Sequence, residues 1–177
     1  MRFTGLNHIC IATNDIDRAV RLWSDRYGVG PWKLWTKHPA NMSATVKGKP
    51  VEFAMRVALC SLSPAVRLEI IQPLDERSPY AESLARHAGV DHIHHVRLDV
   101  DDYVDARAHL LGLGLEPLLD ATFAGAPGVS SVVTATYLGT EAELGFVLEL
   151  GEVPDGFAMP EPESVYPATA ITEEART

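Results

Sequence analysis

Two stretches of this chain share one order of residue types, and this repeat constrains the fold more than any other feature. The first, GLNHICIATNDID, begins at Gly5, and the second, DHIHHVRLDVDD, begins at Asp91. Each has a histidine near its start, then an apolar run typical of a strand, then acidic residues that can cap a helix. A repeat of this kind indicates two copies of one unit, neither of which completes a hydrophobic core without its twin.

The elements expected after the two stretches repeat as well. In the first half, a strand over 5–13 and a helix ended by Gly28 precede three further strands, near 31–37, 51–60 and 65–73. In the second half, a strand over 92–100 and a helix over 102–113 precede three strands, near 115–121, 130–138 and 144–150. The order βαβββ therefore occurs twice, and we expect an α+β fold.

The module boundaries follow from this order. Residues 1–90 are predicted to form the first βαβββ module with a linker helix, which begins with Ser78 as its cap and Pro79 at the first helical position. Residues 91–152 are predicted to form the second module. Residues 153–177 are rich in proline and glutamate, so we expect this tail to lack regular structure.

Composition excludes several classes of function. The chain has 177 residues, is 46% hydrophobic and carries a formal net charge of -9, so it can form a core but lacks the basic surface that a nucleic acid requires. A local cluster of lysines could meet an anionic ligand, although such a scatter is more often part of a solvated loop. Its members are Lys33, Lys37, Lys47 and Lys49. No apolar run approaches the ~18 residues of a membrane span, and the N-terminus lacks the zones of a signal peptide. We therefore expect a cytoplasmic protein that binds neither nucleic acid nor a membrane.

Side chains alternate between the two faces of a strand, so each strand can be divided into an apolar and a polar set. In four of the expected strands the apolar residues share one face, which can pack against a helix, while a histidine or glutamate points to the other face. The four residues that this pattern directs toward the concave side of the sheet are His8, Glu69, His95 and Glu149. His94 shares the face of Val96 and is predicted to point away from that side.

Two imidazoles and two carboxylates make a plausible divalent metal site. These ligand types suit Co, Ni, Mn, Fe or Zn, and four of them leave octahedral positions free for water or substrate. Any one strand histidine or glutamate is more often an ordinary polar group satisfied by its neighbours. The recurrence of the pattern in both halves favours the metal.

Three longer stretches carry a resemblance to a known family. LNHICIATNDIDRAVRLW, LEIIQPLDERSPYAESLARHAGVDHIHHVRLDVDD and GFVLEL resemble the vicinal oxygen chelate (glyoxalase and bleomycin-resistance) superfamily, most closely methylmalonyl-CoA epimerase-like proteins. The likeness extends over residues 5–152. It implies a homodimer whose paired modules form a curled eight-stranded mixed sheet around a metal-centred cavity, with the helices outside. It also implies that one divalent ion is bound by His8, Glu69, His95 and Glu149.

The resemblance also implies a chemistry, in which the metal stabilises an enolate or another oxyanion of the substrate. We expect a metal-dependent isomerase or lyase, epimerase-like or glyoxalase-like, acting on a small carbonyl or acyl-CoA substrate. The catalytic base is expected to be Glu52, which alternation in VEFAM directs to the cavity, or else Glu149. The residues that could contact the substrate, by anion pairing or as an apolar wall, are Arg56, Arg67, Arg97, Trp32 and Trp35. Each arginine could instead pair with a neighbouring acid, and the tryptophans could instead pack between the two halves.

Two other functions remain open. An extradiol-type dioxygenase would use iron at the same site, although that chemistry usually needs two histidines and only one carboxylate. A resistance-type dimer would bind small molecules in the same cavity without metal or catalysis.

Overall fold

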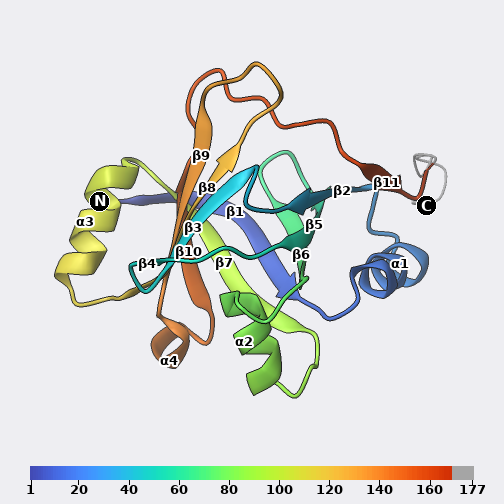
Figure 1. Cartoon of the computed structure of the whole chain (residues 1–177), viewed down its shortest axis with the longest axis horizontal. Coiled ribbons are helices and arrows are strands. Elements are labelled where there is room, and N and C mark those ends of the chain that lie inside the picture. Colours follow the sequence, from blue (N-terminus) through green and yellow to red (C-terminus); the bar gives the residue numbers. More distant parts are fainter. Residues whose placement is uncertain (169–177) are drawn as a thin grey trace.

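The computed structural model describes residues 1–168, which form one mixed sheet with helices on its outer faces (Figure 1). The strands of the first half are β1 (Phe3–Ala12), β2 (Trp32–Lys37), β3 (Met42–Val46), β4 (Lys49–Pro50), β5 (Met55–Ser61) and β6 (Arg67–Pro73). Those of the second half are β7 (His92–Val100), β8 (Pro117–Ala124), β9 (Val132–Leu138), β10 (Val147–Glu152) and β11 (Ser164–Tyr166). The helices are α1 (Ile16–Tyr27), α2 (Pro79–Arg86), α3 (Tyr103–Gly112) and α4 (Glu141–Leu144). None of these helices is both long and apolar enough to cross a membrane.

The strand order confirms the paired modules. Eight strands of the sheet run in the order β2-β5-β6-β1-β7-β10-β9-β8, so both halves place their first strand at the centre and their second strand outermost. β1 and β7 pair antiparallel with each other, while β6 and β10 pair parallel with them on either side. The fold is the expected α+β arrangement, and the curled sheet does not close into a barrel. The exact module boundaries stay predictions.

The sheet has eleven strands, three more than the expected eight. The hairpin of β3 and β4 turns at Lys47 and Gly48, which both have positive φ, and β3 pairs with β8 of the other module. Only residues 38–41 separate β2 from β3, although these strands lie toward opposite ends of the strand order. The chain therefore crosses the open side of the curled sheet. In the sequence this hairpin resembles a polar loop, because its turn contains lysines and a glycine. Its pairing partner β8 lies in the other half of the chain, so no neighbouring strand in the sequence indicates it.

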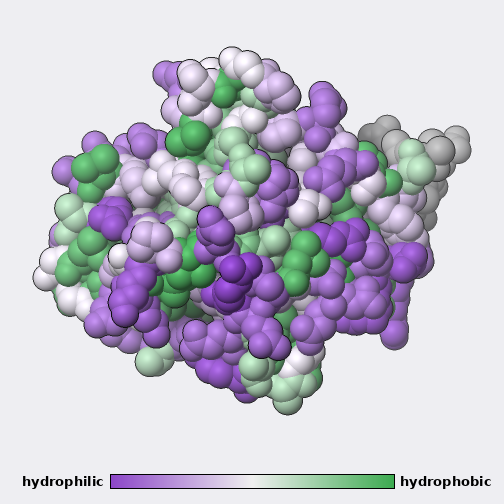
Figure 2. All heavy atoms as spheres, in the orientation of Figure 1, coloured by the Kyte–Doolittle hydropathy of each residue, from purple (hydrophilic) through white to green (hydrophobic). Residues whose placement is uncertain are grey.

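The two longer helices cover the outer faces through apolar stripes. α1 buries Ile16, Ala19 and Val20 against Leu68 and Ile70 of β6, and hydrophilic side chains predominate on its exposed side (Figure 2). On the other module, two residues of α3 pack against strand residues of the predicted apolar set, in a cluster of Ala106, Leu110, Leu138, Leu148 and Leu150. The division of these strands into a helix-facing and a concave-facing set is therefore confirmed. The concave side stays available for a site.

The tail is more ordered than its composition suggests. Its strand β11 pairs antiparallel with β2, and the carboxylate of Glu163 accepts hydrogen bonds from the Thr36 amide and hydroxyl, at 2.7 and 2.8 Å. The Trp35 indole donates to the Pro160 carbonyl oxygen at 3.0 Å. The expectation of an irregular tail is therefore wrong for residues 164–166, because the open edge of β2 offers backbone partners that composition does not reveal. Residues 169–177 lie outside the described part of the chain.

The N-caps of the two repeated helices give a test of the fold. Asp15 accepts a hydrogen bond from the Arg18 amide at 2.9 Å, and Asp102 accepts one from the Asp105 amide at 2.8 Å. Replacing either aspartate with alanine should lower the free energy of unfolding by about 1 kcal/mol, and the two losses should add because the caps share no partner. Urea denaturation measures this. Arg21→Ala, at an exposed position of α1 that takes no part in a cap, is the control, and an equal loss there would contradict the assignment.

Candidate metal centre

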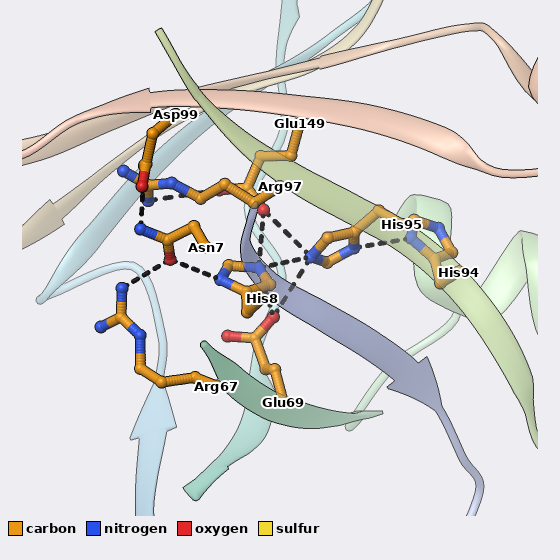
Figure 3. A network of polar contacts seen from close by, with 9 residues as sticks. All are labelled: Asn7, His8, Arg67, Glu69, His94, His95, Arg97, Asp99 and Glu149. Atoms are coloured by element: carbon orange, nitrogen blue, oxygen red, sulfur yellow. Dashed lines mark hydrogen bonds and ion pairs between the residues drawn. The ribbon is translucent and has the colours of Figure 1, made fainter. Parts of the chain in front are cut away.

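Four adjacent central strands direct the four predicted ligands to one point on the concave side of the sheet (Figure 3). In strand order they are Glu69 on β6, His8 on β1, His95 on β7 and Glu149 on β10. All four are buried or nearly so, and His95 is fully inaccessible to solvent. Since 141 residues separate His8 from Glu149, the sheet topology alone brings them into contact.

The distances within this cluster are short and similar. The Nε2 atoms of His8 and His95 are 3.1 Å apart. Glu149 Oε2 lies 2.9 Å from the first and 3.0 Å from the second. Glu69 Oε2 lies 3.5 Å from His8 Nε2 and 3.2 Å from His95 Nε2. One oxygen of each carboxylate thus faces both imidazole nitrogens.

This spacing fits a single divalent ion. Ligand atoms about 2.1 Å from a metal are about 3.0 Å apart at neighbouring octahedral positions and about 3.4 Å apart in a tetrahedron. The contacts of 2.9 to 3.5 Å among the four residues lie in that range. The ligand atoms of His8, Glu69 and His95 all lie within 4.8 Å of one another, and Glu149 joins them through both histidines. The donor set also suits the borderline metals expected from the sequence.

The buried charges perturb one another strongly. Burial lowers the pKa of His95, but hydrogen bonds to Glu149 and Glu69 outweigh burial and raise it to about 9. Burial raises the pKa of Glu149, yet the charge of His8 and its hydrogen bond bring it well below the usual value. The pKa of Glu69 is lowered in the same way by His8 and His95, against the effect of burial. The carboxylates are therefore held in the charged form that binds a cation.

A second layer of residues orients the two imidazoles. His8 Nδ1 lies 3.2 Å from the side-chain oxygen of Asn7, which also accepts a hydrogen bond from Arg67. His95 Nδ1 lies 3.0 Å from His94 Nδ1, and the His94 ring packs on Tyr80 with 4.6 Å between centroids. Because each Nδ1 is engaged behind the cluster, both Nε2 atoms face its centre. Such outer contacts fix the tautomer and ring direction of metal-binding histidines.

A cavity of about 170 Å³ opens beside the cluster and includes His8, Glu69 and Glu149 in its wall. Most of the remaining wall is apolar, including side chains of β5, β8 and the tail. The tail contributes Val153, Phe157 and Met159, so it covers part of the cavity. Three cationic side chains also line the cavity, namely Lys37, Arg67 and Arg97.

Arg97 has an unusual position in this wall. One of its guanidinium nitrogens lies 3.5 Å from Glu149 Oε1, and its Nε has no hydrogen-bond partner among the described residues. The guanidinium also lies against Gly151, where an added Cβ would be 2.6 Å from Arg97 Cζ. A side chain at position 151 would therefore displace the Arg97 guanidinium from this position.

The structure separates the predicted substrate residues into two groups. Trp35, Arg67 and Arg97 line the cavity, and their contact with a substrate stays a prediction. Trp32 does not, because it packs in the α1 cluster and its indole donates to the Val29 carbonyl oxygen at 2.8 Å. Arg56 also points away, since it forms hydrogen bonds of 2.8 and 2.9 Å to Asp17 of α1. These two predictions are wrong.

The expectation for Glu52 is wrong for the same reason as that for Arg56. Both rested on the rule that the apolar face of a strand meets a helix, but in β5 the larger apolar residues Met55, Val57 and Leu59 line the cavity. The helix side of β5 carries the small residues Ala58 and Cys60. Glu52 itself is exposed, precedes β5 and is not part of the cavity wall. Alternation alone cannot orient a strand that is apolar on both faces.

Lys37 lies in the cavity wall, whereas the sequence favoured a solvated loop for it over a contact with an anionic ligand. It ends β2 and is only 7% exposed. A signal was present, because Lys33, Trp35 and Lys37 alternate with the helix-facing Trp32 and Leu34. Phe123 of β8 and the apolar tail residues were missed.

Comparisons with known proteins agree with this geometry. The family model described as Glyoxalase/Bleomycin resistance protein/Dioxygenase superfamily matches residues 7–133. No curated protein matches the chain in sequence. Methylmalonyl-CoA epimerase from Mycobacterium tuberculosis is similar in structure, with a TM-score of 0.59 at 23% identity over 86% of this chain and 90% of that one.

Two further structures are similar to the same extent. A hypothetical protein from Bacillus halodurans has a TM-score of 0.59 at 16% identity over 85% of this chain and 94% of its own. A Streptomyces coelicolor methylmalonyl-CoA epimerase variant in complex with 2-nitronate-propionyl-CoA has a TM-score of 0.55 at 22% identity over 85% and 97%. At these identities the likeness shows the fold, which is shared over most of each chain.

Replacing the two adjacent histidines should affect metal binding unequally. His95→Ala removes a proposed ligand and should abolish stoichiometric loading with Zn²⁺ or Co²⁺. His94→Ala removes only the residue behind that ligand, so affinity should fall by about 10- to 100-fold while saturating ion still loads the site. Metal content after gel filtration and direct titration measure both. Equal and complete loss in both variants would contradict these roles.

Replacing Gly151 tests the position of Arg97. Gly151→Ala should force the guanidinium out of its buried position and lower the free energy of unfolding by about 1–3 kcal/mol. Gly112→Ala is the matched control, because a Cβ there meets no atom within 4 Å and should be neutral or slightly stabilising. Thermal denaturation compares the two, and a crystal structure of Gly151→Ala shows where Arg97 lies. An unmoved guanidinium and an unchanged stability would refute the argument.

Proposed function

Since this chain belongs to the glyoxalase/bleomycin resistance protein/dioxygenase superfamily, we propose that it is a metal-dependent isomerase or lyase. It stabilises the enolate of a small carbonyl or acyl-CoA substrate, and the closest named reaction is that of the methylmalonyl-CoA epimerases to which its structure is similar. The substrate enters the cavity beside the four-residue cluster. The metal is one divalent ion, and Co, Ni, Mn, Fe and Zn all suit the ligands.

One observation carries this proposal, namely the convergence of His8, Glu69, His95 and Glu149. Two carboxylates and two imidazoles are buried in contact with one another on four neighbouring strands. Burying charged groups is costly unless they are paired or bind a metal. A cation at their centre would compensate both carboxylates, which supports a metal centre over an internal polar network.

The residues in and around the cluster have different proposed roles. A divalent ion held there would supply stabilisation for negative charge that develops on a substrate oxygen. Arg97 and Arg67 lie in the same wall and hold an anionic part of the substrate. The apolar wall excludes water from the reacting carbon, which strengthens every charge interaction in the cavity.

Glu149 is the proposed base. It is 2% exposed, its Oε2 faces the histidines and its Oε1 faces Arg97 at 3.5 Å, so the two oxygens have separate environments. It therefore takes part both in metal binding and in removal of the proton next to the substrate carbonyl. Glu52, the other candidate base, lies outside the cavity wall.

A homodimer and a cytoplasmic location also belong to the proposal. Both rest on the resemblance and on composition rather than on a contact seen in this chain. Sedimentation equilibrium of the purified protein measures the first.

The proposed reaction predicts exchange of a carbon-bound hydrogen. With metal-loaded protein in D₂O, methylmalonyl-CoA or a related acyl or small carbonyl substrate should gain one deuterium next to its carbonyl, as read by mass spectrometry. Removal of the metal with a chelator should stop this exchange. Glu149→Gln should slow it by about 10²- to 10⁴-fold, the usual contribution of a general base. Glu52→Gln is the matched control and should keep the wild-type rate.

A dioxygenase is the second candidate, and one observation favours it. The group of His8, Glu69 and His95 is by itself a set of two histidines and one carboxylate, the ligand set of non-heme iron oxygenases. An oxygen electrode separates the two functions. Iron-dependent oxygen consumption without deuterium exchange would replace the isomerase or lyase by the dioxygenase. Protein that takes up no divalent ion even after reconstitution would contradict both and favour a binding module.

A further inference from the structure

Lys37 is a buried cation without an anionic partner. It is 7% exposed and lies at the end of β2. Among residues 1–168 no carboxylate oxygen is within 4.0 Å of its ammonium nitrogen, so it forms no ion pair there. Its Nζ lies 5.9 Å from the centroid of the Phe123 ring. Lysine is almost never buried unless it is paired, because loss of hydration is costly.

The surroundings of Lys37 compensate its charge only in part. Burial lowers the pKa of Lys37, and the more distant charges of Glu69 and Glu163 oppose this only in part. A contact near 6 Å from an aromatic centroid is at the outer limit of a cation–π interaction. Phe123, Trp35 and Met55 belong to the same cavity wall as the lysine. The ammonium group therefore faces a mainly apolar space that can accept a ligand.

We propose that Lys37 binds a carboxylate of the ligand inside the cavity, at a position separated from the metal centre by apolar wall. This adds a substrate contact to the proposed function. The position of the reacting carbonyl at the metal centre rests on that proposed function. The carboxylate contact itself needs no metal. One ammonium neutralises one carboxylate, whereas a doubly charged phosphate would keep an uncompensated charge in these mainly apolar surroundings.

The strand register gives the separation between the two ends of the ligand. Lys37 pairs with Met55, whereas Leu59, which pairs with Glu69, lies four residues further along β5. Four residues of a strand span about 13 Å, of which the long lysine side chain can bridge a part. Between the two positions the wall is formed by Trp35, Val57 and Ile71. The substrate class is thus a small acid whose carboxylate and reactive carbonyl are separated by an apolar segment.

Calorimetry with three probes of one shape tests this proposal. The probes are 3-phenylpropanoate, its neutral amide and 2-phenylethylphosphonate, each titrated into full-length protein with and without a chelator. We expect the carboxylate to bind at least about tenfold more tightly than the amide in both conditions, a difference typical of a buried charge-assisted hydrogen bond. Equal affinities of the two, or no binding by any probe, would overturn the proposal. Tighter binding of the phosphonate would overturn the choice of a carboxylate.

Two lysine variants make the test specific. Lys37→Met keeps the length of the side chain and should abolish the preference for the carboxylate. Lys33→Met is the matched control, because Lys33 lies on the same strand and face but is exposed, and it should keep the preference. A preference that survives Lys37→Met would overturn the proposal. If the wild-type protein binds no divalent ion but still prefers the carboxylate to the amide, the result would count against the proposed function alone.

A stability measurement guards against a variant that merely misfolds. If the buried ammonium is retained for a ligand, its removal relieves an uncompensated burial, so ligand-free Lys37→Met should have a higher Tm than the wild type. A lysine that only supports the fold would give a lower Tm when replaced. Differential scanning calorimetry of the chelator-treated proteins distinguishes these results, and a lower Tm would overturn the assignment to ligand binding.

Discussion

The antiparallel pairing of β1 with β7 is the interaction on which the rest of this structure depends. It joins the two modules through their first strands and opposes Cys10 to His95, which brings the imidazole of His8 to that of His95. The parallel neighbours β6 and β10 then add one glutamate from each side. Neither module holds a complete set of ligands, so a centre of this kind cannot form until both modules have folded and paired. Fold and site are one cooperative unit for that reason.

Sequence alone predicted the parts of the structure in which each strand has one apolar and one polar face. That condition holds for the four strands that carry His8, Glu69, His95 and Glu149, since a helix-packed face makes the polar residue of each strand point inward. It fails for β5, which is apolar on both faces because a helix covers one and the cavity wall forms the other. The misplacement of Arg56 and Glu52 follows directly. A pattern of alternating polarity reports burial, and it does not distinguish a core from a ligand cavity.

The additional strands could not be predicted because they are short and each pairs with a strand far away in the sequence. Their apolar residues, such as Met42 and Tyr166, pack on clusters that only the complete fold brings together. The tail brings Phe157 and Met159 into the cavity wall, so a segment with the composition of a flexible end shapes the space that a substrate would occupy.

The cavity wall contains several buried charged side chains that do not stabilise the fold. At one end each of two carboxylates has an oxygen within 3.5 Å of both imidazoles. Elsewhere in the same wall Lys37 has no ion pair, and the Nε of Arg97 has no hydrogen-bond partner, among the described residues. Each arrangement is costly for folding, since buried charges without compensation destabilise a protein. The two sets have opposite needs, because the carboxylates require a cation and the cationic side chains require an anion. A metal ion together with an anionic, partly apolar substrate would satisfy both sets at once, and the apolar wall between them would keep the two compensations separate.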